Sequence, residues 1–232
     1  MTRKEIRTQY SGFIFFAAKL LTVATGMAFT LMIARSVTQT EYGIWGKINT
    51  VIIPYFTILS AAIPFWVMRF VARDKEGAAK TGILVNAIIA MVATLAYMLL
   101  QPLLVPQFGL ENFIMLYTIA GVQIIEIYLI GVLEGCIQAQ QPHFVGYGLL
   151  VGEICKVLLA STFIIGLQLS LLGAVLSVIV AFTIKMAFYL KITIKELRKR
   201  IVPGYIKEWI KGSAFNMYNI LGDRIAALII VM

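Results

Sequence analysis

Long apolar runs separated by short polar segments occupy almost the whole chain. A helix needs roughly 20 mostly apolar residues, each rising about 1.5 Å, to cross the hydrocarbon core of a bilayer. The runs that meet this requirement are residues 11–34, 44–68, 81–105, 112–133, 146–166 and 170–190. A further run begins near Gly212 and is still apolar at Met232. The pattern predicts an all-α polytopic membrane protein with six transmembrane helices and the start of a seventh, and we expect the chain to be a fragment.

The polar interruption at residues 35–43 separates the first two apolar runs. Gly43 permits a tight turn, and the amphipathic rings of Tyr42 and Trp45 suit a membrane–water interface. We therefore expect an outward-facing hairpin tip between two spans. The other polar segments are also short, and the longest is the basic one before Gly212. The sequence therefore predicts no soluble domain.

Composition agrees with a membrane protein. Apolar residues make up 60% of the chain and charged residues 13%, against about 45–50% and about 25% in globular domains. The basic N-terminal segment leads into an apolar run that is too long for a cleavable signal peptide, contains Lys19 and is followed directly by another span, so we interpret it as the first transmembrane helix. Cys136 and Cys155 share no metal-ligand spacing, and we expect reduced, packed thiols.

The distribution of basic residues predicts the orientation, because Lys and Arg are retained on the cytoplasmic side. With the N-terminus in the cytoplasm, the opposite side keeps Arg35, with Lys47 just inside the next span. The cytoplasmic segments then hold Arg3, Lys4, Arg7, Arg69, Arg73, Lys75, Lys80, Lys191, Lys195, Arg198, Lys199, Arg200, Lys207 and Lys211. We predict a multi-pass protein of the cytoplasmic membrane. Topology and anionic headgroups account for the net charge of +9, so no nucleic-acid partner is expected.

Several ionisable residues fall inside the apolar runs, where each charge costs about 2.5–3.5 kcal/mol at a helix centre. They are Lys19, Glu126, Glu153, Lys156, Lys185, Asp223 and Arg224. Such residues usually face a wet cavity or one another. Lys19 lies roughly 12 Å into the first helix at 1.5 Å per residue and has no acidic residue within four positions. We therefore expect Lys19 to be functional.

The other intramembrane charges leave two interpretations open. Glu153 and Lys156 are three residues apart, so they either neutralise each other or line a cavity. Glu126 shares a stripe with Gln123 and Glu134, and it serves either as a proton-coupling site or as an interhelical partner for a lysine. Lys185 lies near the cytoplasmic end of its helix and either extends to the interface or lines a path.

Small residues and prolines predict close helix contacts and a bend. Gly148 and Gly152 form a small-xxx-small pattern, which allows neighbouring helices to approach closely. Pro54 and Pro64 each remove a backbone donor within the second apolar run and favour a bend there.

Residues 34–82 resemble the first hairpin and following cytoplasmic loop of Wzx-type flippases of the multidrug/oligosaccharidyl-lipid/polysaccharide (MOP) exporter superfamily. The family's first helix commonly ends in Ala-Arg followed by a polar stretch and Tyr-Gly, which Ala34, Arg35, Tyr42 and Gly43 match. The second helix ends in an Arg-x-x-Ala-like pattern, matched by residues 69–72. The segment GDRIA resembles the Asp-Arg of the family's seventh helix, at Asp223 and Arg224. The usual Leu-Gly-Pro after Ala-Arg is here SVTQ, and a glycine common near the end of the second helix is replaced around residues 62–64.

The resemblance implies a two-lobe transporter of twelve to fourteen helices. It divides this chain into an N-terminal six-helix lobe at 1–190, a basic cytoplasmic linker at 191–211 and the start of a second lobe at 212–232, so the C-terminal lobe would be a partner from the same protein. The implied activity is the flipping of a lipid-linked saccharide by alternating access through a charged cleft between the lobes. No enzyme activity, cofactor or metal is expected. The candidate substrate-binding residues are Lys19, Arg35, Lys156 and Arg224, and the candidates for coupling-ion binding or charge pairing are Glu126, Glu153 and Asp223.

Two alternatives remain at the level of sequence. A cation-coupled exporter of drugs or metabolites of the MATE type would use Glu126, Glu153 or Asp223 to bind a proton or sodium ion. A basic lining of the cavity would favour the phosphorylated lipid, and an acidic lining would favour cationic drugs. A membrane-embedded glycan polymerase or transferase is the other alternative. The single His143, the lack of an Asp-x-Asp metal pair and the lack of a large outward loop weigh against it.

Overall fold

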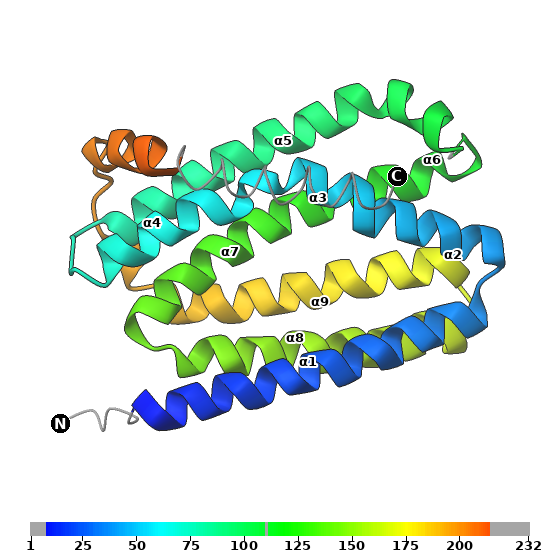
Figure 1. The fold of residues 1–232 in the computed structure, drawn as a ribbon, viewed down its shortest axis with the longest axis horizontal. Helices are drawn as coiled ribbons and strands as arrows, with labels where there is room; N and C mark the ends of the chain where they lie inside the picture. The colour runs from blue at the N-terminus through cyan, green and yellow to red at the C-terminus, as the bar shows by residue number, and fades with distance from the viewer. Residues whose placement is uncertain (1–7, 110, 214–232) are drawn as a thin grey trace.

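The computed structural model is a bundle of helices that follows the apolar runs of the sequence (Figure 1). It describes residues 8–109 and 111–213. Within this part, five helical segments are long and apolar enough to cross a membrane, and a bent pair of helices can form a sixth span. The segments are Tyr10–Ser36, Ala78–Gln107, Glu111–Gln140, His143–Gly166 and Ser170–Thr193, with the bent pair at Gln39–Phe56 and Ile58–Val71. The described residues contain no strand, so the predicted all-α fold and its first six spans are confirmed. The predicted seventh span, from Gly212 to Met232, lies outside the described residues except for Gly212 and Ser213.

The spans are divided into shorter elements. The elements in chain order are α1 (Thr8–Ser36), α2 (Gln39–Gly46), η1 (Lys47–Ile52), α3 (Ile53–Phe56), η2 (Ile58–Ala61), α4 (Ala62–Val71), α5 (Ala78–Phe108), η3 (Glu111–Phe113), α6 (Ile114–Ala120), α7 (Val122–Gln140), α8 (His143–Ala160), η4 (Ser161–Gly166), α9 (Ser170–Thr193) and η5 (Glu196–Arg198). Residues 204–213 form a further helix, which we name the linker helix.

The second span is bent by 60° at Thr57, between the two prolines that predicted a bend. Proline has no backbone N–H to continue the helical ladder, so carbonyl groups near the break need other partners. The Tyr128 hydroxyl of α7 donates a hydrogen bond to the Phe56 carbonyl at 3.1 Å. A Cβ atom at Gly135 would come within 2.9 Å of the Pro64 carbonyl oxygen, so glycine there lets α7 approach the bent span.

The expected turn at Gly43 is wrong, because Gly43 lies inside α2. The chain reverses at residues 37–38, and Thr38 caps α2. The Glu41 N–H donates to the Thr38 hydroxyl at 3.3 Å, while the Thr38 N–H donates to the Glu41 carboxylate at 2.9 Å. This capping box satisfies two backbone donors and therefore starts a helix at Gln39, five residues before the apolar run that begins at residue 44. The Ser170 hydroxyl also donates to Glu41, at 2.8 Å, and links this turn to the start of α9.

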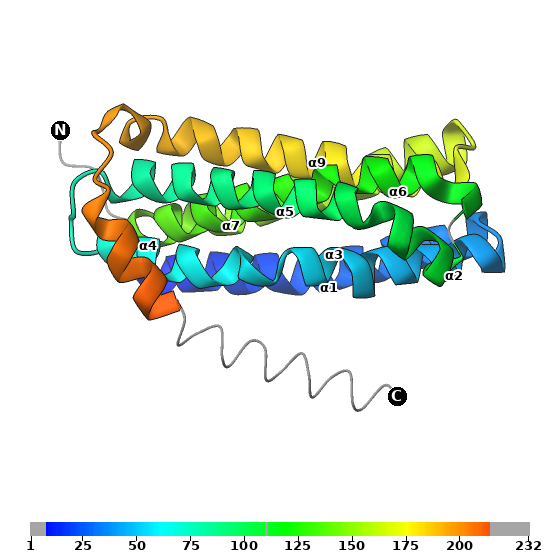
Figure 2. The ribbon, with the colours of Figure 1, turned by 90° about the horizontal axis from the view of Figure 1, so that it is seen from above.

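Close helix contacts connect α1 to α8, α8 to α9, α9 to α7, and α7 to both α4 and α5. The predicted small-residue stripe on α8 makes one of these contacts. Gly148 packs against the ring of Tyr189 on α9, and Gly152 packs against the stem of Lys185. Viewed from above, α1 and the bent span lie along one side of the bundle and α9 lies along the opposite side (Figure 2).

The two ends of the bundle differ in charge. At one end, the helices are connected by residues 72–77, 141–142 and 194–203 (Figure 1), and we name this the basic end. The segment after α9 is fixed to this end: the Val202 N–H donates to the Thr81 hydroxyl at 2.9 Å, and the Tyr205 hydroxyl donates to the Glu76 carbonyl at 3.3 Å. Gly77 has a φ of 76°, and the Arg200 carbonyl oxygen occupies the space that a side chain at Gly77 would need. Glycine at this turn therefore permits both the backbone conformation and the close approach.

Candidate functional site

The first group of intramembrane charges lies where α1 crosses α8. Lys156 and Glu153 form an ion pair at 2.7 Å, with 15% and 14% of their side chains exposed. The Thr25 hydroxyl of α1 donates to the same Glu153 carboxylate at 2.7 Å, and the Lys156 amine lies 5.4 Å from the centre of the Phe29 ring. The structure therefore shows the mutual neutralisation that the spacing of Glu153 and Lys156 allowed. Within this group, the lysine charge is balanced by its own helix neighbour.

The second group lies between α7 and α9. The Thr183 hydroxyl donates to Glu126 at 2.6 Å, and only 3% of Glu126 is exposed. Among the described residues, the other carboxyl oxygen of Glu126 has no hydrogen-bond partner, and neither has the amide nitrogen of Gln123 one turn away. None of the ion pairs among the described residues involves Glu126. A buried carboxylate without a paired cation is costly.

A third group lies nearer the basic end of the same two helices. Lys185 of α9 forms an ion pair with Glu134 of α7 at 2.6 Å, and the Tyr189 hydroxyl lies 3.1 Å from the same carboxylate. Lys185 thus has an interhelical partner, although we expected it to extend to the interface or to line a path. Both charges stood out in the sequence as polar residues at or near apolar runs. Their pairing was not visible in the sequence because the two residues lie 51 positions apart (185 − 134), on different helices.

Lys19 lies in a different environment from these pairs. Its side chain is exposed, its amine lies 5.5 Å from the centre of the Phe15 ring, and it forms no ion pair with any described residue. Glu126 and Glu153 have the other partners given above, so neither carboxylate neutralises Lys19 within the described part of the chain. The amine is therefore available to a ligand or to a part of the protein that lies outside this description.

The surface of α1 explains how Lys19 is presented. Gly12, Lys19, Gly26 and Thr30 recur at intervals of seven and four, which places them on one stripe of the helix. Gly12, Lys19 and Thr30 are exposed and Gly26 is half-buried, and no described atom lies within 4 Å of a Cβ atom built at either glycine. A neighbouring stripe carries the exposed apolar side chains Phe13, Phe16, Leu20, Val23, Met27 and Leu31, as expected for contact with lipid. The stripe with Lys19 carries smaller or more polar side chains.

The structure does not bring the candidate substrate-binding residues into one cluster. Arg35 is exposed at the end of α1, roughly 24 Å along the helix from Lys19 at 1.5 Å per residue. Lys156 contacts α1 near Phe29, between these two positions. Asp223 and Arg224 lie outside the described residues. Across residues 8–109 and 111–213, no group of three or more His, Cys, Asp or Glu side chains is placed to hold a metal ion.

Comparison with known proteins shows similarity at the level of fold. No protein-family model and no curated protein sequence matches the chain. Solved structures that share the fold include a MATE transporter in complex with MaD5, with a TM-score of 0.77 and 14% sequence identity over 98% of this chain and 59% of that chain. A MOP superfamily transporter from Pyrococcus furiosus gives a TM-score of 0.74 and 14% identity over 94% and 52% of the two chains. The Vibrio cholerae MATE transporter VcmN in its bent form gives 0.72 and 16% over 96% and 56%.

These similarities show the architecture of the chain. It has the fold of one part of a MOP superfamily transporter and spans between about 52% and 59% of the solved chains that it matches. The apolar helices and these structural neighbours support a multi-pass membrane protein whose fold is shared with transporters. The Pyrococcus furiosus protein is described as having a binding pocket of reversed polarity, which suggests a different function for that protein.

Proposed function

We propose that this chain is the N-terminal lobe of a MOP superfamily transporter that flips a lipid-linked saccharide across the cytoplasmic membrane. The stripe of α1 that carries Lys19 would face the cleft between this lobe and a C-terminal lobe of the same protein. The N-terminus and the basic end would lie in the cytoplasm, since basic residues are retained there. Alternating access would rock the two lobes against each other.

The proposal rests on the positive charge of Lys19, which remains after Lys156 and Lys185 have been paired with acidic residues. The carboxylates of Glu153 and Glu134 are each paired with a lysine, whereas exposed Lys19 is paired with no described acid. An anionic phosphate or pyrophosphate on a lipid carrier would find an attractive charge at Lys19, and a cationic drug would meet repulsion there. Lysine binds phosphate as a point charge, and the attraction is stronger in a low-dielectric cleft than in water.

Reconstitution tests this function. The complete protein would be placed in liposomes with a fluorescent lipid-linked saccharide, and a membrane-impermeant reagent would quench the dye exposed on the outer leaflet. We expect the protein to increase the quenchable fraction, and we expect unlabelled lipid-linked saccharide to compete. A fluorescent phospholipid without a saccharide serves as the control substrate. Equal transport of both lipids would contradict the saccharide assignment.

A cation-coupled exporter of the MATE type is the second candidate, and buried Glu126 favours it. A carboxyl group that has one unpartnered oxygen and no paired cation within the described part of the chain is suited to gain and lose a proton during transport. This role requires that Glu126→Gln abolish proton-driven efflux of a cationic dye while leaving protein abundance unchanged. If the complete protein moves no cationic dye under a pH gradient, this candidate fails, and the flippase proposal does not depend on it.

A further inference from the structure

The linker helix at residues 204–213 crosses the end of the bundle and has two distinct sides. One side packs against α4: the Trp209 ring is fully buried and lies 5.6 Å from the Phe70 ring, and the Tyr205 ring lies 5.1 Å from the same ring. Gly212 completes this contact, because the Trp66 ring occupies the space of its missing side chain. The linker helix is therefore held in a fixed position on the lobe.

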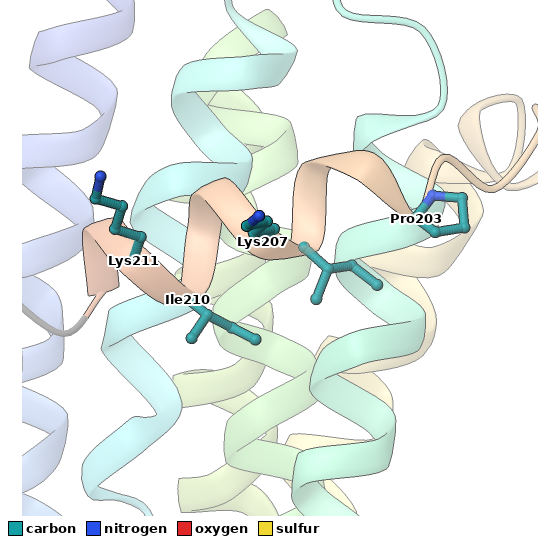
Figure 3. Close-up of a pocket in the computed structure, with 5 residues that line it drawn as sticks. Pro203, Lys207, Ile210 and Lys211 are labelled. Carbon is teal, nitrogen blue, oxygen red and sulfur yellow. The ribbon is translucent and has the colours of Figure 1, made fainter.

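The other side of the linker helix combines apolar and basic side chains. Ile206, Lys207, Ile210 and Lys211, together with Pro203, line an open hollow (Figure 3). Ile210 is 60% exposed, and Lys207 and Lys211 are also exposed. An aliphatic side chain left open beside two lysines is not explained by packing within the described part of the lobe.

The depth of the linker helix follows from its contacts with α4. It packs on Trp66 and Phe70, and α4 ends at Val71. The contact therefore covers the last two turns of the span, within roughly 8 Å of its end at 1.5 Å per residue. The polar headgroup region occupies about 5–8 Å on each side of the hydrocarbon core. A helix at this level of the span would lie at the membrane–water interface rather than in bulk water.

The side chains of the linker helix point in directions that suit a helix at the membrane–water interface. In Figure 3, Lys211 points toward the basic end of the bundle, and Ile210 points the opposite way along it. An interfacial helix needs this arrangement, since its lysines reach for headgroups while its apolar side chains enter the acyl boundary. Arg69 of α4 adds a third cation near the linker helix, because its guanidinium lies 5.0 Å from the Trp66 ring that packs against Gly212.

We propose that the outer side of the linker helix, made of Ile206, Lys207, Ile210 and Lys211, is a binding surface for anionic phospholipids of the membrane leaflet. Lys207 and Lys211 contact the phosphate groups, and Ile206 and Ile210 enter the upper acyl region. The positive charge of this surface selects anionic over zwitterionic lipids, and its apolar pair selects a membrane over a soluble anion. This surface is separate from the Lys19 stripe, so the inference is independent of the transported substrate.

The depth of the linker helix can be measured directly. The complete protein, with Cys136→Ala and Cys155→Ala, would carry a single bimane-labelled cysteine at Ile210→Cys or, as the matched control on the same helix, at exposed Glu208→Cys. In nanodiscs, we expect an acyl-chain nitroxide to quench the label at 210 more strongly than the label at 208, and aqueous iodide to show the reverse order. Equal iodide quenching at both sites would overturn the proposal. Protection of position 210 from both quenchers would also overturn it, because protein would then cover this side.

A second measurement tests lipid selectivity. The label at position 210 would be quenched by a headgroup nitroxide carried on phosphatidylglycerol or on phosphatidylcholine. Replacing Lys207 and Lys211 with Gln should lower the preference for phosphatidylglycerol by about fivefold per lysine, the factor expected for one cation at an anionic surface. The charge-matched control, Lys75→Gln with Lys195→Gln, changes exposed lysines outside the linker helix and should have little effect. Equal losses in both variants, or no loss in either, would contradict a specific surface.

Discussion

The ring of Tyr189 on α9 occupies the space that a side chain at Gly148 on α8 would need. The same ring carries a hydroxyl group 3.1 Å from the Glu134 carboxylate and 3.1 Å from the Val145 carbonyl. One missing side chain on α8 therefore lets an aromatic residue of α9 reach both α7 and α8. The contact joins three helices near the Glu134–Lys185 ion pair.

This relationship makes Gly148→Ala destabilising. The added methyl group would overlap the Tyr189 ring, which is fully buried and cannot move away easily. Overpacking of this kind costs about 1–3 kcal/mol, so we expect a lower midpoint of thermal unfolding in detergent, followed by fluorescence-detected size exclusion. Gly204→Ala is the matched control, because no described atom lies within 4 Å of its Cβ position. Similar midpoints for the two variants would show that the close contact does not determine stability.

The Glu134–Lys185 pair predicts a coupling between α7 and α9. Lys185→Gln alone leaves Glu134 without its cation, and Glu134→Gln alone leaves a mostly buried lysine. We expect each single change to lower thermal stability and the double change to recover part of the loss. A double-mutant cycle should give a coupling energy of about 0.5–3 kcal/mol. Strict additivity of the two single effects would mean that the ion pair does not couple the helices.

The spans were predictable from sequence because a bilayer imposes a length on apolar helices. The bend at Thr57 was predictable in kind, since Pro54 and Pro64 each remove a backbone donor. The start of α2 was missed, although its signal is local: Thr38 and Glu41 have the spacing of a capping box. Apolar patterning predicted a turn in the polar segment at residues 35–43, and the glycine at position 43 supported that interpretation.

The tertiary features were not predictable for a different physical reason. Whether Glu153 uses Lys156 or Lys19 depends on which face of α8 meets α1, and a single sequence does not contain that information. The linker helix is another example, since residues 204–211 were interpreted as part of a basic cytoplasmic linker and Gly212 as the start of a seventh helix. Trp209 is fully buried there because Phe70 and Trp66 of a distant segment provide an aromatic surface. Helical periodicity over ten residues carries too little signal to reveal such a contact.

The proposed orientation can be tested by labelling from outside the cell. Gln39 is exposed at the connection between α1 and α2, and Glu76 is exposed at the basic end. In a protein with Cys136→Ala and Cys155→Ala, an impermeant maleimide should modify Gln39→Cys in intact cells. The same reagent should modify Glu76→Cys only after the membrane is permeabilised. The reverse pattern would place the basic end outside and contradict an N-terminus in the cytoplasm.

Lys19 provides the sharpest test of the flippase proposal, because the structure removes its simplest structural role. No described carboxylate pairs with it, so Lys19→Ala strands no buried acid within the described part of the lobe. We therefore expect this variant of the complete protein to reach the membrane in normal amounts and to lose transport of the lipid-linked saccharide. Lys19→Arg should keep part of the activity, because the proposed role depends more on charge than on shape.

The control for Lys19 is Lys191→Ala, which removes an exposed lysine from the last turn of α9. It should leave transport close to that of the unchanged protein, which separates an effect of position from a general loss of positive charge. Lys19→Glu should be at least as damaging as Lys19→Ala, since it would repel an anionic phosphate at the same point. Abundance and transport are measured together for all four variants. If Lys19→Ala lowered abundance as much as transport, and loss of an acidic residue elsewhere in the complete protein restored both, Lys19 would be a structural charge partner and not a phosphate ligand.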